Sequence, residues 1–195
     1  MGRPTTFVRL TGCPLRCGYC DSEYAFYGGK RLTIDDLLQQ VILAAAPLVC
    51  VTGGEPLAQP AVHELLRRLC DTGFSASLET SGALDIAEVD DRVSIVMDLK
   101  TPDSGEQSKN LLTNVKHLKN KDQVKFVLCS RNDYEWARFQ MEHLHLVEQV
   151  GEVLLSPSFG QLDPKELADW IVADRLPVRF QVQLHKLLWG DKPGV

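Results

Sequence analysis

Three cysteines within eight residues are the part of this chain best suited to chemistry. Cys13, Cys17 and Cys20 are spaced C-x3-C-x2-C in a segment that contains Pro and Gly and follows the apolar run 7–10. Soft thiolate ligands suit iron, and such a segment can wrap closely around a cluster. A cubane cluster has four irons, so three protein ligands leave one iron open to another molecule. The spacing therefore predicts a [4Fe–4S] cluster with an open iron.

A zinc site is the alternative for the same cysteines. Zinc would need a fourth ligand, and neither His nor Cys occurs in the dozen residues after Cys20. Zinc sites also tend to pair two short Cys-x2-Cys clips, of which this chain has one. The spacing favours a cluster, and a zinc-stabilised, non-catalytic binding module stays open as the alternative.

Length and composition indicate one globular domain spanning residues 1–195. Hydrophobic content is 44% and charged content 24%, as in ordinary water-soluble proteins. A net charge of -5 without a basic tract gives no sign of nucleic-acid binding, and no apolar run approaches a membrane span or a signal peptide. The remaining cysteines, Cys50, Cys70 and Cys129, lie in apolar runs and are expected to be buried thiols. These features favour the cytoplasm, with no membrane partner.

Apolar runs and amphipathic segments alternate along the chain. Strands are expected at 7–10, 48–52, 74–79, 93–99, 123–128, 152–155 and 178–184. Helices are expected between them, one capped by Thr33 with Asp36, one running from Ser130 to about 147, and one starting at Asp163-Pro164. A modest helix is expected at 111–118. A strand, polar motif and helix repeated in this way predict a parallel α/β fold.

Polar motifs follow three of the expected strands. They are the segments 53–56 (Gly-Gly-Glu-Pro), 79–82 (Glu-Thr-Ser-Gly) and 98–102 (Asp-Leu-Lys-Thr-Pro). Parallel barrels and open α/β sheets place their sites at the carboxyl ends of strands, so these motifs are expected to share one site with the cysteines. Each motif also has a simpler interpretation. Segment 53–56 could be a generic turn, segment 79–82 a polar strand end that caps the next element, and Lys100 an exposed lysine beside Asp98.

The cysteine spacing, the aromatic Tyr19 before the last cysteine and the Gly-Gly-Glu-Pro segment resemble the radical S-adenosylmethionine (SAM) superfamily. The resemblance implies an incomplete TIM-type (β/α) barrel of about six parallel strands. It also implies that SAM chelates the open iron and is cleaved by an electron from the cluster to methionine and a 5′-deoxyadenosyl radical. The positions that match cofactor contacts are Tyr19, Gly53, Gly54, Glu55, Glu79, Thr80, Ser81 and Lys100.

Flanking residues resemble one family within that superfamily, the 7-carboxy-7-deazaguanine synthases. The matching segments are 7–13 (Phe-Val-Arg-Leu-Thr-Gly-Cys), 20–22 (Cys-Asp-Ser), 183–186 (Gln-Leu-His-Lys) and the terminal Gly-Val. This implies a lyase that converts 6-carboxy-5,6,7,8-tetrahydropterin to 7-carboxy-7-deazaguanine with loss of ammonia, on the route to queuosine. It also implies a homodimer and a flavodoxin-type electron donor.

The same resemblance assigns substrate and metal contacts. Arg9 would form a bidentate ion pair with the substrate carboxylate, and Ser22 would ligate a Mg²⁺ that also binds substrate. Further substrate contacts would come from Gly53, His185 and Val195, with His185 expected on the last strand. A glycyl-radical-enzyme activase is the other enzyme alternative, which the segments 20–22 and 183–186 argue against.

The chain departs from this family at its start. The family begins with a strand and a Gln-Gly-Glu-Gly segment that cradles the pterin, and both would lie before Met1. Without that wall, the edge of the sheet and the polar contacts to the substrate would be incomplete. Residues 1–195 alone are therefore expected to bind the substrate poorly.

Overall fold

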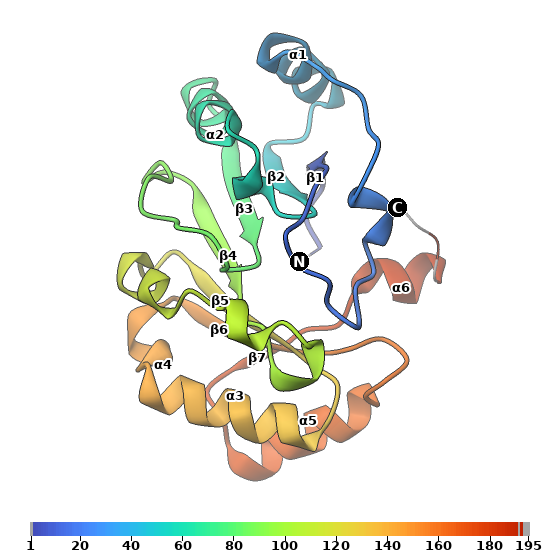
Figure 1. The fold of residues 1–195 in the computed structure, drawn as a ribbon, viewed down its shortest axis with the longest axis vertical. Coiled ribbons are helices and arrows are strands. Elements are labelled where there is room, and N and C mark those ends of the chain that lie inside the picture. Colours follow the sequence, from blue (N-terminus) through green and yellow to red (C-terminus); the bar gives the residue numbers. More distant parts are fainter. Residues whose placement is uncertain (1, 191, 193–195) are drawn as a thin grey trace.

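A seven-stranded parallel sheet forms the centre of the protein, for which a computed structural model describes residues 2–190 and 192. Its strands follow one another in chain order, as Figure 1 shows. The predicted parallel α/β fold is confirmed, with seven strands where about six were expected. The strands are β1 (Thr5–Leu10), β2 (Leu48–Gly53), β3 (Ser75–Thr80), β4 (Ser94–Asp98), β5 (Gln123–Leu128), β6 (Glu152–Pro157) and β7 (Arg179–Phe180).

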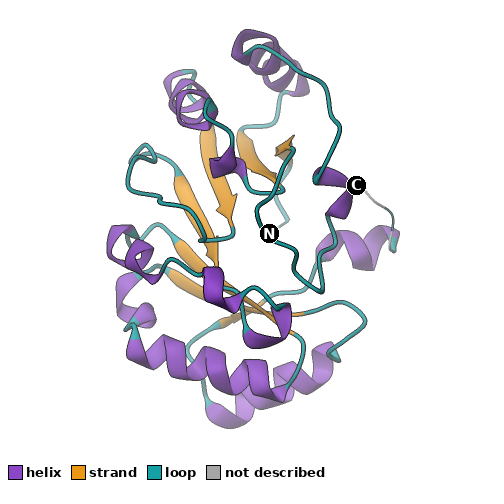
Figure 2. Ribbon diagram, viewed as in Figure 1, coloured by secondary structure: helices purple, strands orange, loops and turns teal. Residues whose placement is uncertain are grey.

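Helices fill most of the connections between strands (Figure 2). The α-helices are α1 (Ile34–Ala44), α2 (Val62–Asp71), α3 (Arg131–His143), α4 (Leu146–Gln149), α5 (Pro164–Asp174) and α6 (Leu184–Trp189). Short 3₁₀ turns are η1 (Glu23–Ala25), η2 (Pro56–Ala58), η3 (Pro102–Ser104), η4 (Gln107–Lys109) and η5 (Leu112–His117). Since η3 and η4 directly follow β4, that strand ends in a compact loop.

The sheet is an open barrel. Parallel pairing runs from Thr5↔Leu48 between β1 and β2 to Leu155↔Phe180 between β6 and β7, and the two outer strands have no recorded pairing with each other. Side chains of one face, including those of Val51, Leu78 and Phe126, are buried against the helices. Alternate residues point to the other, inner face, which carries polar side chains beside some apolar ones. The polar side chains on it include those of Arg9, Thr52, Glu79, Asp98 and Lys125.

Helix starts follow the local signals in the sequence. Thr33 Oγ1 accepts a hydrogen bond from the backbone N–H of Asp36 at 3.1 Å, as the predicted cap of α1 requires. The Asp163 side chain likewise accepts from Lys165 N at 2.8 Å, with Pro164 in the first turn of α5. Both predicted helix starts are confirmed.

The C-terminal strand prediction is wrong in length. β7 has two residues, and Leu184 begins helix α6, so His185 lies on a helix and not on a strand. The apolar positions of 178–188 fit both periods, and β6 offers β7 partners only at Leu154 and Leu155. Because β6 pairs with only two residues of β7, the chain then leaves the sheet and forms helix α6.

Three smaller expectations are also corrected. The modest helix at 111–118 is the 3₁₀ segment η5, and the helix expected to reach 147 breaks at His145, which adopts a left-handed φ of 51°. Cys50 is buried as expected, but Cys70 and Cys129 are only half-buried. Within residues 2–190 and 192, none of the helices has the length and apolar character needed to cross a bilayer.

Candidate functional site

The cysteine loop leaves the carboxyl end of β1 and is fixed by backbone hydrogen bonds. Gly12 N donates to Ala25 O at 2.9 Å, Gly18 N donates to Ser104 O at 3.0 Å, and Cys20 N donates to Cys17 O at 3.1 Å. The bond from Gly18 ties the loop to η3, so the cysteines lie beside the end of β4. All three thiols are free and half-buried.

The three thiols form a soft donor set in a partly desolvated place. Burial raises the pKa of the Cys17 thiol to about 11, and the neighbouring Cys13 and Cys20 contribute in the same direction. Burial also raises the pKa of Cys20. Metal ligation needs thiolates, so binding iron here would release protons.

A single metal ion fits this arrangement less well than a cluster. In the described part of the chain, no three His, Cys, Asp or Glu side chains are gathered closely enough to hold one ion. A cubane spreads its ligands over separate irons, so its cysteines stand farther apart than those around zinc. The donors present fit a [4Fe–4S] cluster held by one loop.

Gly53 and Gly54 are required by a close backbone approach. A Cβ on Gly53 would lie 2.0 Å from Leu10 O, and one on Gly54 would lie 2.2 Å from Gly12 O. At this point Gly54 N donates to Leu10 O at 3.0 Å, and Glu55 N donates to Gly12 O at 2.8 Å. The two glycines thus bring the end of β2 against the start of the cysteine loop, which adds a structural reason to their predicted role in cofactor binding.

Glu55 is fully buried, and its carboxylate is occupied by neighbouring protein groups. Thr80 Oγ1 donates to Oε1 at 2.9 Å, Ser81 N and Ser81 Oγ donate to Oε2 at 2.6 and 2.5 Å, and Leu57 N donates to Oε1 at 3.0 Å. These bonds join the ends of β2 and β3. These bonds give Glu55 a positioning role, and the direct cofactor contact expected from the sequence stays a prediction.

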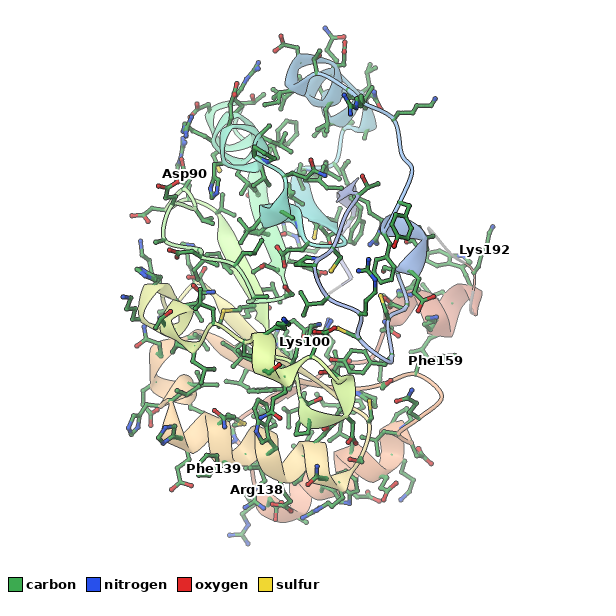
Figure 3. All side chains as sticks on the ribbon, viewed as in Figure 1. Asp90, Lys100, Arg138, Phe139, Phe159 and Lys192 are labelled. Atoms are coloured by element: carbon green, nitrogen blue, oxygen red, sulfur yellow. The ribbon has the colours of Figure 1, made fainter. Side chains whose placement is uncertain are left out.

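Lys100 is buried rather than the exposed lysine of the simpler interpretation. Its Nζ lies 2.9 Å from Asp98 Oδ2 and 5.7 Å from the centre of the Tyr19 ring. Figure 3 labels Lys100, at the end of β4 beside the loop that follows β1. The hydroxyl of Tyr19 is buried without a partner among the described residues. Burial of that hydroxyl, followed by the Asp98 charge, raises the pKa of Tyr19, so the phenol stays protonated.

A second group of predicted residues gathers on the inner side of β1. Arg9 Nη1 lies 3.4 Å from Ser22 Oγ, and Ser22 Oγ donates to Asp21 Oδ1 at 2.9 Å. Asp21 also accepts from Gln183 at the start of α6. The structure therefore brings Arg9 and Ser22 next to the C-terminal segment, as a shared substrate site requires.

The remaining predicted residues have less definite surroundings. Glu79 is exposed on the inner face and lies 3.4 Å from the Thr52 hydroxyl. His185 is half-buried on α6, two residues after Gln183. Val195 lies outside the described residues.

Sequence reasoning missed residues that hold the cysteine loop in place. Arg16 donates from Nη1 to Cys13 O at 2.8 Å and to Leu15 O at 2.6 Å, and its guanidinium lies 4.3 Å from the centre of the Phe26 ring. Its backbone N–H donates to Glu106 at 2.7 Å. Arg16 lies inside the cysteine motif and could have been noticed there, whereas Glu106 is 90 residues away with no local signal.

Comparisons with known proteins place this geometry in a family. A family model described as the radical SAM superfamily matches residues 7–135. A protein of Chlorobaculum tepidum named 7-carboxy-7-deazaguanine synthase is 42% identical, over 100% of this chain and 90% of its own. The chain belongs to this family of radical SAM proteins.

Relatives from other organisms bear the same name. The protein from Koribacter versatilis is 40% identical, over 96% of this chain and 89% of its own, and that from Thermoplasma acidophilum is 36% identical, over 100% and 92%. Membership in the radical SAM superfamily implies SAM and a [4Fe–4S] cluster as cofactors. The zinc-module alternative is not favoured.

Solved structures confirm the fold at greater distance. SuiB of Streptococcus suis matches with a TM-score of 0.65 and 15% identity, over 92% of this chain and 49% of SuiB. A structure of SuiB bound to S-adenosylmethionine matches with a TM-score of 0.62, also at 15% identity. This chain spans about half the length of SuiB, so the likeness concerns the core fold.

Proposed function

We propose that this protein converts 6-carboxy-5,6,7,8-tetrahydropterin to 7-carboxy-7-deazaguanine with release of ammonia. The observation that carries the proposal is the pairing of the cysteine loop with the Gly-Gly-Glu segment, through Gly54 N to Leu10 O and Glu55 N to Gly12 O. That pairing puts the cysteine loop directly beside the half-buried Gly53 and Gly54 at the carboxyl edge of the sheet. The identity to family members over the whole chain supports the choice of substrate.

Cys13, Cys17 and Cys20 would hold the cluster, and the ends of β2, β3 and β4 would hold SAM. Cluster and SAM, when bound, supply a one-electron cleavage that generates a carbon-centred radical. Tyr19, Gly53, Gly54 and the polar residues Glu79, Thr80, Ser81 and Lys100 would orient SAM, with Glu55 fixing the positions of Thr80 and Ser81. The half-buried loop would limit the access of water to that chemistry.

Arg9 and Ser22 would bind the substrate end that carries the carboxylate. A guanidinium can pair with a carboxylate through two parallel hydrogen bonds, and Arg9 is held toward the inner face by Tyr24, 5.6 Å below it. Ser22 would contribute one oxygen to a Mg²⁺ that also takes substrate and water oxygens. Gly53, His185 and Val195 complete the proposed substrate contacts.

The test is an anaerobic turnover assay of the protein reconstituted with iron and sulfide. With SAM, dithionite, Mg²⁺ and 6-carboxytetrahydropterin, we expect mass spectrometry to detect 7-carboxy-7-deazaguanine and an assay to detect ammonia. Arg9→Ala should raise KM for the pterin while SAM binding stays unchanged. If this chain and an N-terminally extended form both cleaved SAM without converting any pterin, that result would contradict the proposed substrate. It would still support the proposed cleavage of SAM.

We further propose a flavodoxin-type electron donor and a homodimer. The first 31 residues carry five Arg or Lys residues and two acidic residues in a chain of net charge -5, so the cluster-bearing segment is suited to an acidic donor. Leu187, Leu188 and Trp189 are exposed on α6 and offer apolar surface for a second copy. Reduction by purified flavodoxin and light scattering would test the two proposals separately.

A further inference from the structure

A buried ion pair lies behind the cysteine loop. Lys100 and Asp98 side chains are 10% and 20% exposed, with Nζ 2.9 Å from Oδ2. The backbone of Lys100 is fixed by Asn110, whose Oδ1 accepts from Lys100 N at 2.9 Å and whose Nδ2 donates to Lys100 O at 2.8 Å. The other oxygen of Asp98 is buried without a partner among the described residues. Burying two charges is costly, so a purely structural benefit is a weak explanation for this pair.

Both charges lie beside the loop that would hold the cluster. The Lys100 ammonium is 5.7 Å from the centre of the Tyr19 ring, and Tyr19 stands between Cys17 and Cys20 in the chain. The bond from Gly18 N to Ser104 O, at 3.0 Å, holds the same loop against the segment that follows β4. One cation and one anion are therefore held next to the segment that carries the three cysteines.

We propose that Lys100 and Asp98 together set the reduction potential of the cluster, with Lys100 raising it and Asp98 lowering it. The proposal rests on the proposed function, because it requires the cluster. A [4Fe–4S] core with three thiolates is negative, and one added electron makes it more so. A cation in a site shielded from water favours the reduced form, and an anion disfavours it.

The experiment is a redox titration of the reconstituted protein without SAM, followed by electron paramagnetic resonance. At the wild-type midpoint, Lys100→Met should lower the ratio of reduced to oxidised cluster about tenfold, which equals a shift of about 59 mV for one electron. Asp98→Asn should raise that ratio severalfold, and Lys100→Arg should stay near wild type. Lys165→Gln removes an exposed lysine on α5 that pairs with Asp169, and should change nothing.

The opposite signs separate this role from a structural one. A purely structural ion pair would make both substitutions lose cluster or shift the ratio in the same direction, which would overturn the proposal. If Lys100 served only a carboxylate of SAM, the SAM-free ratio would not move, and that result would also overturn it. Should Lys100→Met fail to fold, Asp98→Asn decides alone, since an unchanged or lowered ratio contradicts the inference. A wild type without any [4Fe–4S] cluster would instead reject the proposed function.

Discussion

At the scale of single residues, the site depends on two glycines that are pressed against another backbone. Gly54→Ala would put a Cβ 2.2 Å from Gly12 O and 2.9 Å from the Cβ of Cys13. Because Gly12 O, the nearest neighbour, is a backbone atom that cannot move aside, we expect the free energy of unfolding to fall by about 3 kcal/mol. Iron retention should fall with it. Urea unfolding and iron analysis would measure both.

A matched glycine supplies the control. Gly105 has a φ of +75° and open space around its Cβ position, so Gly105→Ala should cost only the backbone strain, about 1 kcal/mol. Iron retention should be unaffected there. Gly54 itself has no positive φ, so a loss at Gly54 no larger than that at Gly105 would argue against the approach to the cysteine loop as its cause.

Glu55 offers a second test at this scale, because a positioning role and direct cofactor contact predict different results. Glu55→Ala would leave the Ser81 and Leu57 N–H groups without their acceptor in a buried place. We expect the apo protein to lose about 3 kcal/mol of unfolding free energy, and Glu55→Gln to lose less. An apo stability equal to wild type, combined with weakened SAM binding, would restore the direct role.

At the scale of elements, the β3–β4 connection is tied to α2 by charged groups whose effect depends on pH. Arg92 donates to Asp90 from its backbone N and Nε, both at 2.9 Å, and to Asp71, at the end of α2, at 2.7 Å. The hydrogen bonds from Arg92 lower the pKa of Asp90 well below its usual range. A carboxyl with a lowered pKa stabilises the fold at higher pH and loses that effect as acid protonates it.

Asp90→Asn should therefore destabilise the protein most at neutral pH. The difference from wild type should shrink as the pH falls below about 4, where the unfolded carboxyl takes up its proton. Urea unfolding at several pH values would measure it. Asp169→Asn, which removes an exposed pair on α5, should show little difference at any pH; a constant penalty for Asp90→Asn would refute the electrostatic account.

Local patterns predicted the elements well wherever a strand is buried on both sides or a helix has its own cap. The cap of α1 by Thr33 and the start of α5 at Asp163 needed only neighbouring residues. The local patterns predicted too long a strand at 178–184, because the number of pairing partners on β6 decides how long β7 can be. A short apolar run does not carry that information.

At the scale of the whole molecule, the site is made by contacts between distant segments. Cys13, Cys17 and Cys20 could be identified from spacing, but the bond from Gly18 to Ser104 and the contact of Asp21 with Gln183 join parts of the chain that no local pattern relates. For the same reason the sequence could not show that Glu55 binds Thr80 and Ser81. Motif spacing identified the chemistry, and tertiary contacts divide its residues into those that face ligands and those that support them.

The most direct measurement is the metal content and spectrum of the anaerobically reconstituted protein, before and after addition of SAM. We expect about four irons and a matching amount of sulfide per chain. We also expect the electron paramagnetic resonance signal of the reduced cluster to change when SAM binds the open iron, and the cluster to be lost in Cys17→Ala. Uptake of zinc alone would contradict a three-cysteine site with an open iron at this edge of the sheet. A cluster signal that does not change on addition of SAM would contradict it as well.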